Sequence, residues 1–149
     1  MELARFLVKA KRNTYAGGGE EKRLEDGSRE LVFEKDGFKY RDRYFGSNPF
    51  SGEEVVWHDG RVVWAMNYRG WVVSPDASPE EIYDFLKEAL MKVEEAKPFR
   101  GPRMFRKGDL EYANRPVGSI EDFRGTEKIR SRSKRKDLYI LFYHGGSVE

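Results

Sequence analysis

The fold is decided by residues 38–69, which read FKYRDRYFGSNPFSGEEVVWHDGRVVWAMNYR. Alternate side chains of a β-strand point to opposite faces of the sheet. The first strand of this stretch therefore places Phe38, Tyr40, Asp42 and Tyr44 on one face and Lys39, Arg41, Arg43 and Phe45 on the other. A carboxylate between two tyrosines on the core face needs a partner, because an unpaired buried charge is costly. We expect a functional site, if the domain has one, to lie around this carboxylate.

Two hairpin signals predict four consecutive strands. Asp36-Gly37 separates residues 30–34 from 38–45, and Asp59-Gly60 separates residues 54–58 from 61–68. An Asp-Gly pair between alternating apolar residues is typical of a two-residue hairpin turn. A loop joins the two hairpins, and the result is an antiparallel meander.

Apolar residues at helical spacing predict one helix before the meander and one after it. The first runs from about Glu2 to Arg12, with Lys11 away from its apolar face. The second begins with Ser78 as N-cap, Pro79 at the first position and two acids in the first turn. After the first helix, residues 17–19 are three glycines without the spacing or the preceding strand of a phosphate loop, which favours a mobile linker.

Strand patterns return in the last third of the chain. We predict a short strand over residues 109–114, two more over 119–123 and 126–130, and a clear one over 137–143. The chain is thus predicted to form one α+β domain over residues 1–149, with a mostly antiparallel, curved sheet of about seven strands and two packed helices. The expected order is α-β-β-β-β-α-β-β-β.

Composition excludes several kinds of site. The chain has no cysteine and two histidines, so no disulfide, thiolate nucleophile, metal site or cofactor is predicted. No signal peptide begins the chain and no apolar run approaches the roughly 20 residues that span a bilayer, so we expect a cytoplasmic protein without a membrane partner. Abundant Lys, Arg and Glu, with 36% charged residues, is a hint of a thermophile.

The cluster of aromatic and charged residues has two interpretations. In one, the strands line a pocket in which arginine binds a carboxylate or phosphate and tyrosine and asparagine orient the ligand. In the other, Asp42, Glu53 or Glu54 pairs with the arginines across neighbouring strands. Alternation puts some members on opposite faces, so all of them can line one pocket only if a bulge intervenes. The predicted contacts to a small anionic or polar-aromatic ligand are Tyr40, Arg41, Arg43, Glu54, Trp64, Asn67, Tyr68 and His144.

An acid–base enzyme is the alternative function. Asp42 and Glu54 would form a carboxylate pair in which one acid has a raised pKa, and His144 would act as general base. The other interpretation of His144 is a structural role at the end of a strand, and this one is favoured. Arg100, just after the second helix, is expected either to close over the pocket mouth as an anion ligand or to bind the carbonyls at the helix end.

A basic run suggests nucleic acid as a third possibility. Residues 128–136 contain six Lys and Arg and no acid, and clustered cations bind phosphate backbones through counterion release. No aromatic residue interleaves the run, and the other interpretation is a solvated hairpin tip whose lysines protect a strand edge. The candidate nucleic-acid contacts are Lys128, Arg130, Arg132, Lys134, Arg135 and Lys136.

A series of short motifs along the chain resembles one uncharacterised family. The motifs are YRDRYFG (40–46), GEEVV (52–56), MNYRG (66–70), FRGP (99–102) and YHGG (143–146). The family comprises small bacterial and archaeal domains of unknown function, found alone or, in bacteria, joined to a helix-turn-helix DNA-binding domain. The resemblance implies no catalytic residues, and the fused arrangement implies a domain that senses a small molecule. This chain departs from that arrangement because it has no helix-turn-helix segment of its own and carries the basic run between its last two strands.

Overall fold

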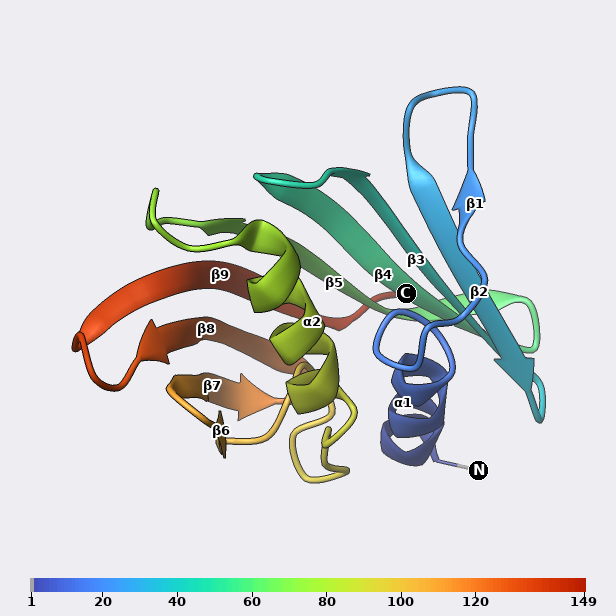
Figure 1. The fold of residues 1–149 in the computed structure, drawn as a ribbon. Helices are drawn as coiled ribbons and strands as arrows, with labels where there is room; N and C mark the ends of the chain where they lie inside the picture. Colours follow the sequence, from blue (N-terminus) through green and yellow to red (C-terminus); the bar gives the residue numbers. More distant parts are fainter. Residues whose placement is uncertain (1) are drawn as a thin grey trace.

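The computed structural model describes residues 2–149 and shows one curved antiparallel sheet with two helices on its concave side (Figure 1). The elements are α1 (Leu3–Arg12), β1 (Lys22–Arg23), β2 (Arg29–Lys35), β3 (Phe38–Gly46), β4 (Phe50–His58), β5 (Arg61–Val72), α2 (Pro79–Leu90), β6 (Met104–Lys107), β7 (Leu110–Ser119), β8 (Asp122–Ser131) and β9 (Lys136–Ser147). The strand order is β1-β2-β3-β4-β5-β9-β8-β7-β6. Two meanders, β1–β5 and β6–β9, are therefore joined where β5 pairs with β9.

The α+β class and the antiparallel sheet are confirmed, but the expected number of strands is wrong: the sheet has nine. The edge strand β1 has only two residues, too few for an alternating pattern. The strands predicted over residues 119–123 and 126–130 are largely one strand, β8. Position 125, inside β8, needs a glycine, because a Cβ atom there would lie 2.2 Å from the ring of Tyr143.

The hairpin turns of the first meander form as predicted. Asp36 and Gly37 have φ angles of 51° and 82°, and Asp59 and Gly60 have 48° and 81°. Positive φ at both central residues belongs to the type I′ turn, whose twist matches that of the strands it joins. The predicted N-cap is also confirmed, because Ser78 Oγ accepts a hydrogen bond of 3.3 Å from the amide of Glu81.

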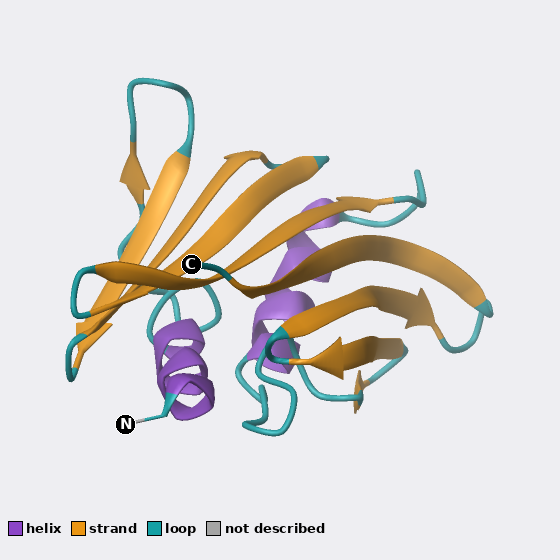
Figure 2. Ribbon diagram, turned by 180° about the vertical axis from the view of Figure 1, so that it is seen from behind, coloured by secondary structure: helices purple, strands orange, loops and turns teal. Residues whose placement is uncertain are grey.

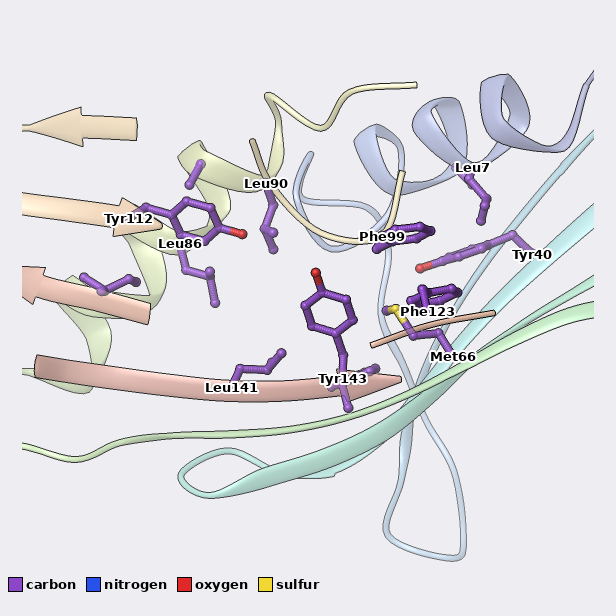
Figure 3. Close-up of a cluster of buried hydrophobic side chains, with 14 of the residues drawn as sticks. Leu7, Tyr40, Met66, Leu86, Leu90, Phe99, Tyr112, Phe123, Leu141 and Tyr143 are labelled. Atoms are coloured by element: carbon purple, nitrogen blue, oxygen red, sulfur yellow. The ribbon is translucent and has the colours of Figure 1, made fainter. Parts of the chain in front are cut away.

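The core lies between the concave face of the sheet and the two helices, and no helix of the described chain covers the convex face (Figures 1 and 2). Its centre is an aromatic stack. The ring centroids of Phe99 and Phe123 lie 3.9 Å apart with their planes 6° from parallel, and Trp64 stacks on the same Phe123 at 5.7 Å. Figure 3 shows Phe99 and Phe123 beside Tyr40 and Met66. The stack joins the loop after α2 to both meanders.

Within residues 2–149, neither helix is long and apolar enough to cross a membrane.

Removing the middle ring of this stack should destabilise the protein strongly. We expect Phe123→Ala to lower the free energy of unfolding by about 3–5 kcal/mol, as large-to-small changes of buried phenylalanine do. Urea denaturation followed by circular dichroism measures it. The matched control is Phe45→Ala, because Phe45 is 49% exposed on the convex face and should lose no more than about 0.5 kcal/mol. Equal losses in the two variants would contradict this description of the core.

Candidate functional site

The sheet divides the predicted ligand-binding residues between its two faces. Tyr40, Glu54, Trp64 and Tyr68 are buried on the concave face. Strand pairing places the other four on the convex face, where none of them reaches the concave side. The bulge that could have brought the two sets together lies between Val56 and Trp57, at the far end of β4. The convex residues are Arg41, Arg43, Asn67 and His144.

A cavity of about 400 Å³ opens on the concave face between α1, α2 and strands β2 to β5. Three predicted residues, Tyr40, Glu54 and Tyr68, line it. Trp64 does not: it is fully buried behind the cavity, and its indole N–H donates to the carbonyl of Ile120 at 3.1 Å. The other residues that line the cavity with polar or aromatic side chains include Lys11, Tyr15, Asp42, Phe50, Tyr83, Phe99 and Arg100.

The first buried ion pair of the cavity joins α1 to β4. Lys11 Nζ donates to Glu54 Oε1 at 2.6 Å and to the carbonyl of Phe99 at 2.6 Å. Burial lowers the pKa of Lys11, and the charge of Glu54 opposes that shift. The expectation that Lys11 lies away from the apolar face of the first helix is wrong. It follows Leu7 by four residues, so it shares the buried stripe.

The second ion pair joins the loop after α2 to β8. Arg100 donates to both carboxylate oxygens of Glu127, at 2.8 and 2.9 Å. Tyr112 and Tyr139 also donate to this carboxylate, at 2.5 and 2.9 Å, and Glu127 is fully buried. Burial alone lowers the pKa of Arg100, but the charge of Glu127 outweighs it and the pKa rises.

Arg100 takes neither of the two roles expected from the sequence. Its guanidinium lines the cavity but is bound to Glu127, rather than free at the mouth. The carbonyls beyond α2 are bound by another arginine: Arg12 donates to Met91 and Val93 at 3.0 and 3.1 Å.

Asp42 differs from the other buried carboxylates because no Lys, Arg or His within the described residues forms an ion pair with it. Its one hydrogen-bond donor is Tyr68, whose hydroxyl lies 2.5 Å from Oδ1. Strand pairing sets Glu54 directly opposite. Burial, and then the charge of Glu54, raise the pKa of Asp42 to about 7. Asp42 and Glu54 are therefore neighbours on the concave face, and one of the two has a raised pKa, as the acid–base hypothesis requires.

The predicted third member of that acid–base set, His144, is not at the site. It is exposed on the convex face, opposite Asn67 of β5, whereas the preceding Tyr143 points into the core. The two arginines of β3 are also occupied on the convex face. Arg41 stacks on Trp57 at 5.1 Å, and Arg43 lies 3.8 Å from Glu30.

The three glycines at residues 17–19 form a tight turn at the cavity instead of a linker. The amide of Gly19 donates to the carbonyl of Thr14 at 2.7 Å. A Cβ atom at Gly17 would lie 1.9 Å from the carbonyl oxygen of Arg12, so only glycine fits there. Gly18 and Gly19 line the cavity beside Tyr15, whose pKa burial raises to about 12. The turn is part of the wall.

The basic run forms the hairpin between β8 and β9, as one of its two interpretations predicted. Asp109 fixes the tip by accepting from Ser131 Oγ at 2.5 Å and from the amide of Ser133 at 2.7 Å. Lys128 lies 3.3 Å from Asp137, and the remaining basic residues of the run are exposed or half-buried.

Residues 42–148 match the model of a family described as a domain of unknown function, DUF5680. The chain belongs to this family. The match agrees with the uncharacterised domain family that the sequence motifs resemble. No curated protein and no solved structure matches the chain. The DUF5680 region includes Asp42, Glu54, Arg100 and Glu127, whereas Lys11 precedes it.

Two buried charged residues of this DUF5680 chain, Lys11 and Glu127, were not predicted as part of the site, although the sequence holds a signal for each. Lys11 has helical spacing from the apolar Leu7. Glu127 alternates with Phe123 and Ile129 on the buried face of β8, as Asp42 alternates with tyrosines on β3. Among the described residues no group of three or more His, Cys, Asp or Glu is arranged to hold a metal ion.

Breaking the buried Arg100–Glu127 pair should unfold the domain more easily. We expect Glu127→Gln to lower the free energy of unfolding by about 3–5 kcal/mol, because the guanidinium would remain buried without a counter-charge. Guanidinium-chloride denaturation measures this. Glu88→Gln is the control: it breaks the Lys107–Glu88 pair, which is mostly exposed, and should cost at most about 1 kcal/mol. A similar cost for both changes would show that the buried pair has no special weight.

Asp42 should make stability fall as the pH rises from about 4 to about 7. Its pKa is raised from 3.8 to about 7 in the folded state, so between these values the folded state holds a proton that the unfolded state has lost. Asp42→Asn removes this effect and still accepts from Tyr68. The stability of the variant relative to wild type should therefore increase with pH, by up to about 1.4 kcal/mol per pH unit.

Urea denaturation at pH 5 and pH 8 tests this. The charged and titratable groups that face Asp42 are Lys11, Glu54, Tyr68 and Arg100, and they are unchanged in the variant. Glu53→Gln on the convex face is the control and should show no such trend. A constant difference between Asp42→Asn and wild type would mean that Asp42 titrates normally.

Proposed function

We propose that this DUF5680 domain binds a small polar-aromatic ligand in the concave cavity, with a donor group of the ligand bound to Asp42. The observation that carries the proposal is a buried carboxylate at a cavity of about 400 Å³, to which Tyr68 is the one donor among residues 2–149. A carboxylate has about four acceptor sites, and leaving them unused in a buried place is costly. An amine, amide or hydroxyl of a ligand would use them.

The size and lining of the cavity suit a flat molecule. Ligand pockets usually enclose about 300–1,000 Å³ and combine aromatic walls with a few convergent polar groups. Here the walls come from Tyr15, Tyr40, Tyr68, Tyr83 and Phe99. Tyr40 and Tyr68 are held by the sheet, and Tyr83 by α2.

The buried cations of the cavity are paired, which favours a neutral or cationic ligand over an anion, one of the two kinds of ligand expected from the sequence. Lys11 is neutralised by Glu54 and Arg100 by Glu127. The arginines expected to bind an anion, Arg41 and Arg43, lie on the other face. Of the described residues, ionised Asp42 is then the buried charge at the cavity without an ion pair, and the half-buried Lys87 of the cavity wall lies over the ring of Tyr15.

Acid–base catalysis in the same cavity is the second candidate, because a pKa of about 7 suits a group that exchanges protons at neutral pH. Asp42 would be the acid or base, with Glu54 and Tyr68 as neighbours. His144 has no part in it.

A thermal-shift screen of small amines and polar heteroaromatic compounds tests ligand binding. At 100 times its dissociation constant a ligand stabilises the folded state by about 2.7 kcal/mol, which corresponds to a rise in Tm of roughly 5–10 °C for a chain of this size. We expect Asp42→Asn to lose this rise and Arg43→Ala to keep it. Affinity should be higher at pH 8 than at pH 5.5, because the ionised carboxylate is the stronger acceptor.

Isothermal titration calorimetry of each stabiliser on the three proteins completes the test. A ligand that binds Asp42→Asn as tightly as wild type, but not Arg43→Ala, would place the site on the convex face and contradict the proposal. Conversion of a bound compound that stops in Asp42→Asn, with binding retained, would establish the catalytic alternative.

A further inference from the structure

The convex face of β5, β9, β8 and β7 is a continuous surface that the cavity does not use. Strand pairing sets its side chains in three rows of four. We call this surface the convex platform. Its rows are Arg69, Phe142, Thr126 and Arg115; Trp71, Ile140, Lys128 and Ala113; and Asn67, His144, Arg124 and Val117.

An exposed aromatic ring lies in the row of Arg69 and Phe142, which is between the other two rows of the platform. Phe142 is 50% exposed although it lies on an inner strand of the sheet. Arg69 is its direct partner on β5. Arg124 and Lys128 flank its partner on β8, which places them diagonally from the ring and within reach of long side chains. Trp71 packs beside Phe142, with ring centroids 6.3 Å apart.

The platform carries positive charge only. Its twelve side chains include three arginines and one lysine and no acid. Lys128 has a carboxylate partner, Asp137 at 3.3 Å, and both side chains are nearly half exposed. Within the described chain, Arg69, Arg115 and Arg124 form no ion pair. The platform therefore presents three arginines without a carboxylate partner, of which Arg69 stacks on Trp71 at 5.8 Å.

We propose that the convex platform binds single-stranded nucleic acid. An exposed aromatic side chain on an open sheet offers a stacking surface to a base, and arginines around it bind the phosphates on either side. The platform is three strand spacings wide, about 14 Å, which suits a short stretch of nucleotides. The basic run continues from its edge, because Arg130 follows Lys128 on β8 and the hairpin tip adds Arg132 and Lys134.

The charge pattern selects this occupant over others. Two copies of the chain would bring cations against cations if they paired through this face, which is unfavourable. A polyanion without bases would use the cations but leave Phe142 exposed. A single-stranded nucleic acid satisfies both features. The proposal is independent of the ligand cavity, because the two sites lie on opposite faces of the sheet.

Fluorescence anisotropy of the whole chain with labelled mixed-sequence 12-nucleotide RNA and DNA tests the proposal. We expect binding at 50 mM salt that weakens as salt rises, with a slope of about −2 to −3 in log K against log salt for three or four phosphate contacts. Phe142→Ala should weaken binding at least fivefold. Its matched control, Phe45→Ala, removes an equally exposed phenylalanine of the same face, 49% against 50%, and should bind normally.

A charge variant separates the contribution of the cations. Arg124→Gln should weaken binding and reduce the slope by about 0.7, whereas Lys22→Gln, at the far edge of the sheet, should leave both unchanged. Asp42→Asn should bind the oligonucleotide as wild type does. Quenching of tryptophan fluorescence by the oligonucleotide, through Trp71, would support the placement.

Several results would overturn the proposal. One is the absence of binding at 50 mM salt. A second is equal affinity for inorganic polyphosphate with no effect of Phe142→Ala, which would identify a general polyanion surface. The third is dimerisation in analytical ultracentrifugation that Phe142→Ala abolishes, which would make the platform an interface between copies. Binding to anionic lipid vesicles but not to oligonucleotides would also overturn it.

Discussion

The ion pair between Arg100 and Glu127 is the interaction on which the rest of the structure depends. A carboxylate that is fully buried must be matched by charge and hydrogen bonds, and Glu127 receives both from Arg100 and from two tyrosines. Arg100 lies on the loop after α2, so the pair fixes this loop against the second meander. The preceding residue, Phe99, gives its carbonyl to Lys11 of α1 and its ring to the central aromatic stack. Two consecutive residues thus hold both helices and both meanders together, and the cavity is the space that this arrangement leaves.

Tyr68 connects the paired charges to the unpaired one. Its ring lies 5.6 Å below the guanidinium of Arg100, and its hydroxyl donates to Asp42. The guanidinium over the face of the ring makes a cation–π interaction. This contact helps to hold the tyrosine in place for its hydrogen bond to Asp42. Asp42 is therefore fixed in place by a network that does not neutralise it. Burial and the charge of Glu54 raise the pKa of Asp42, and strongly shifted pKa values in cavities are typical of functional groups.

The sequence predicted the elements that depend on local rules. The Asp-Gly turns, the cap at Ser78 and the alternation along β3 each follow from a few neighbouring residues, and each is confirmed. The partners of the buried charges could not be predicted in this way, because Lys11 and Glu54 are 43 positions apart and Arg100 and Glu127 are 27 apart. Glycines were misinterpreted for a related reason. Gly17 and Gly125 suggested breaks in the chain, whereas each is needed for close approach to an atom that only the tertiary structure brings near.

Because helices cover only one face of the sheet, each strand carries two unrelated sets of side chains. Tyr68 points to the cavity and Arg69 to the convex platform, and on β9 Tyr143 and Phe142 divide in the same way. The predicted ligand site grouped residues that are close in sequence, and it was therefore divided between two surfaces, because neighbours along a strand point to opposite faces. Net charge misleads similarly. The chain carries only +2 overall, yet a buried carboxylate without an ion pair lies on one side of the sheet and the platform gathers four cations on the other. Charges can thus be arranged differently on the two faces of a single sheet, so that the net charge of a small domain describes neither face.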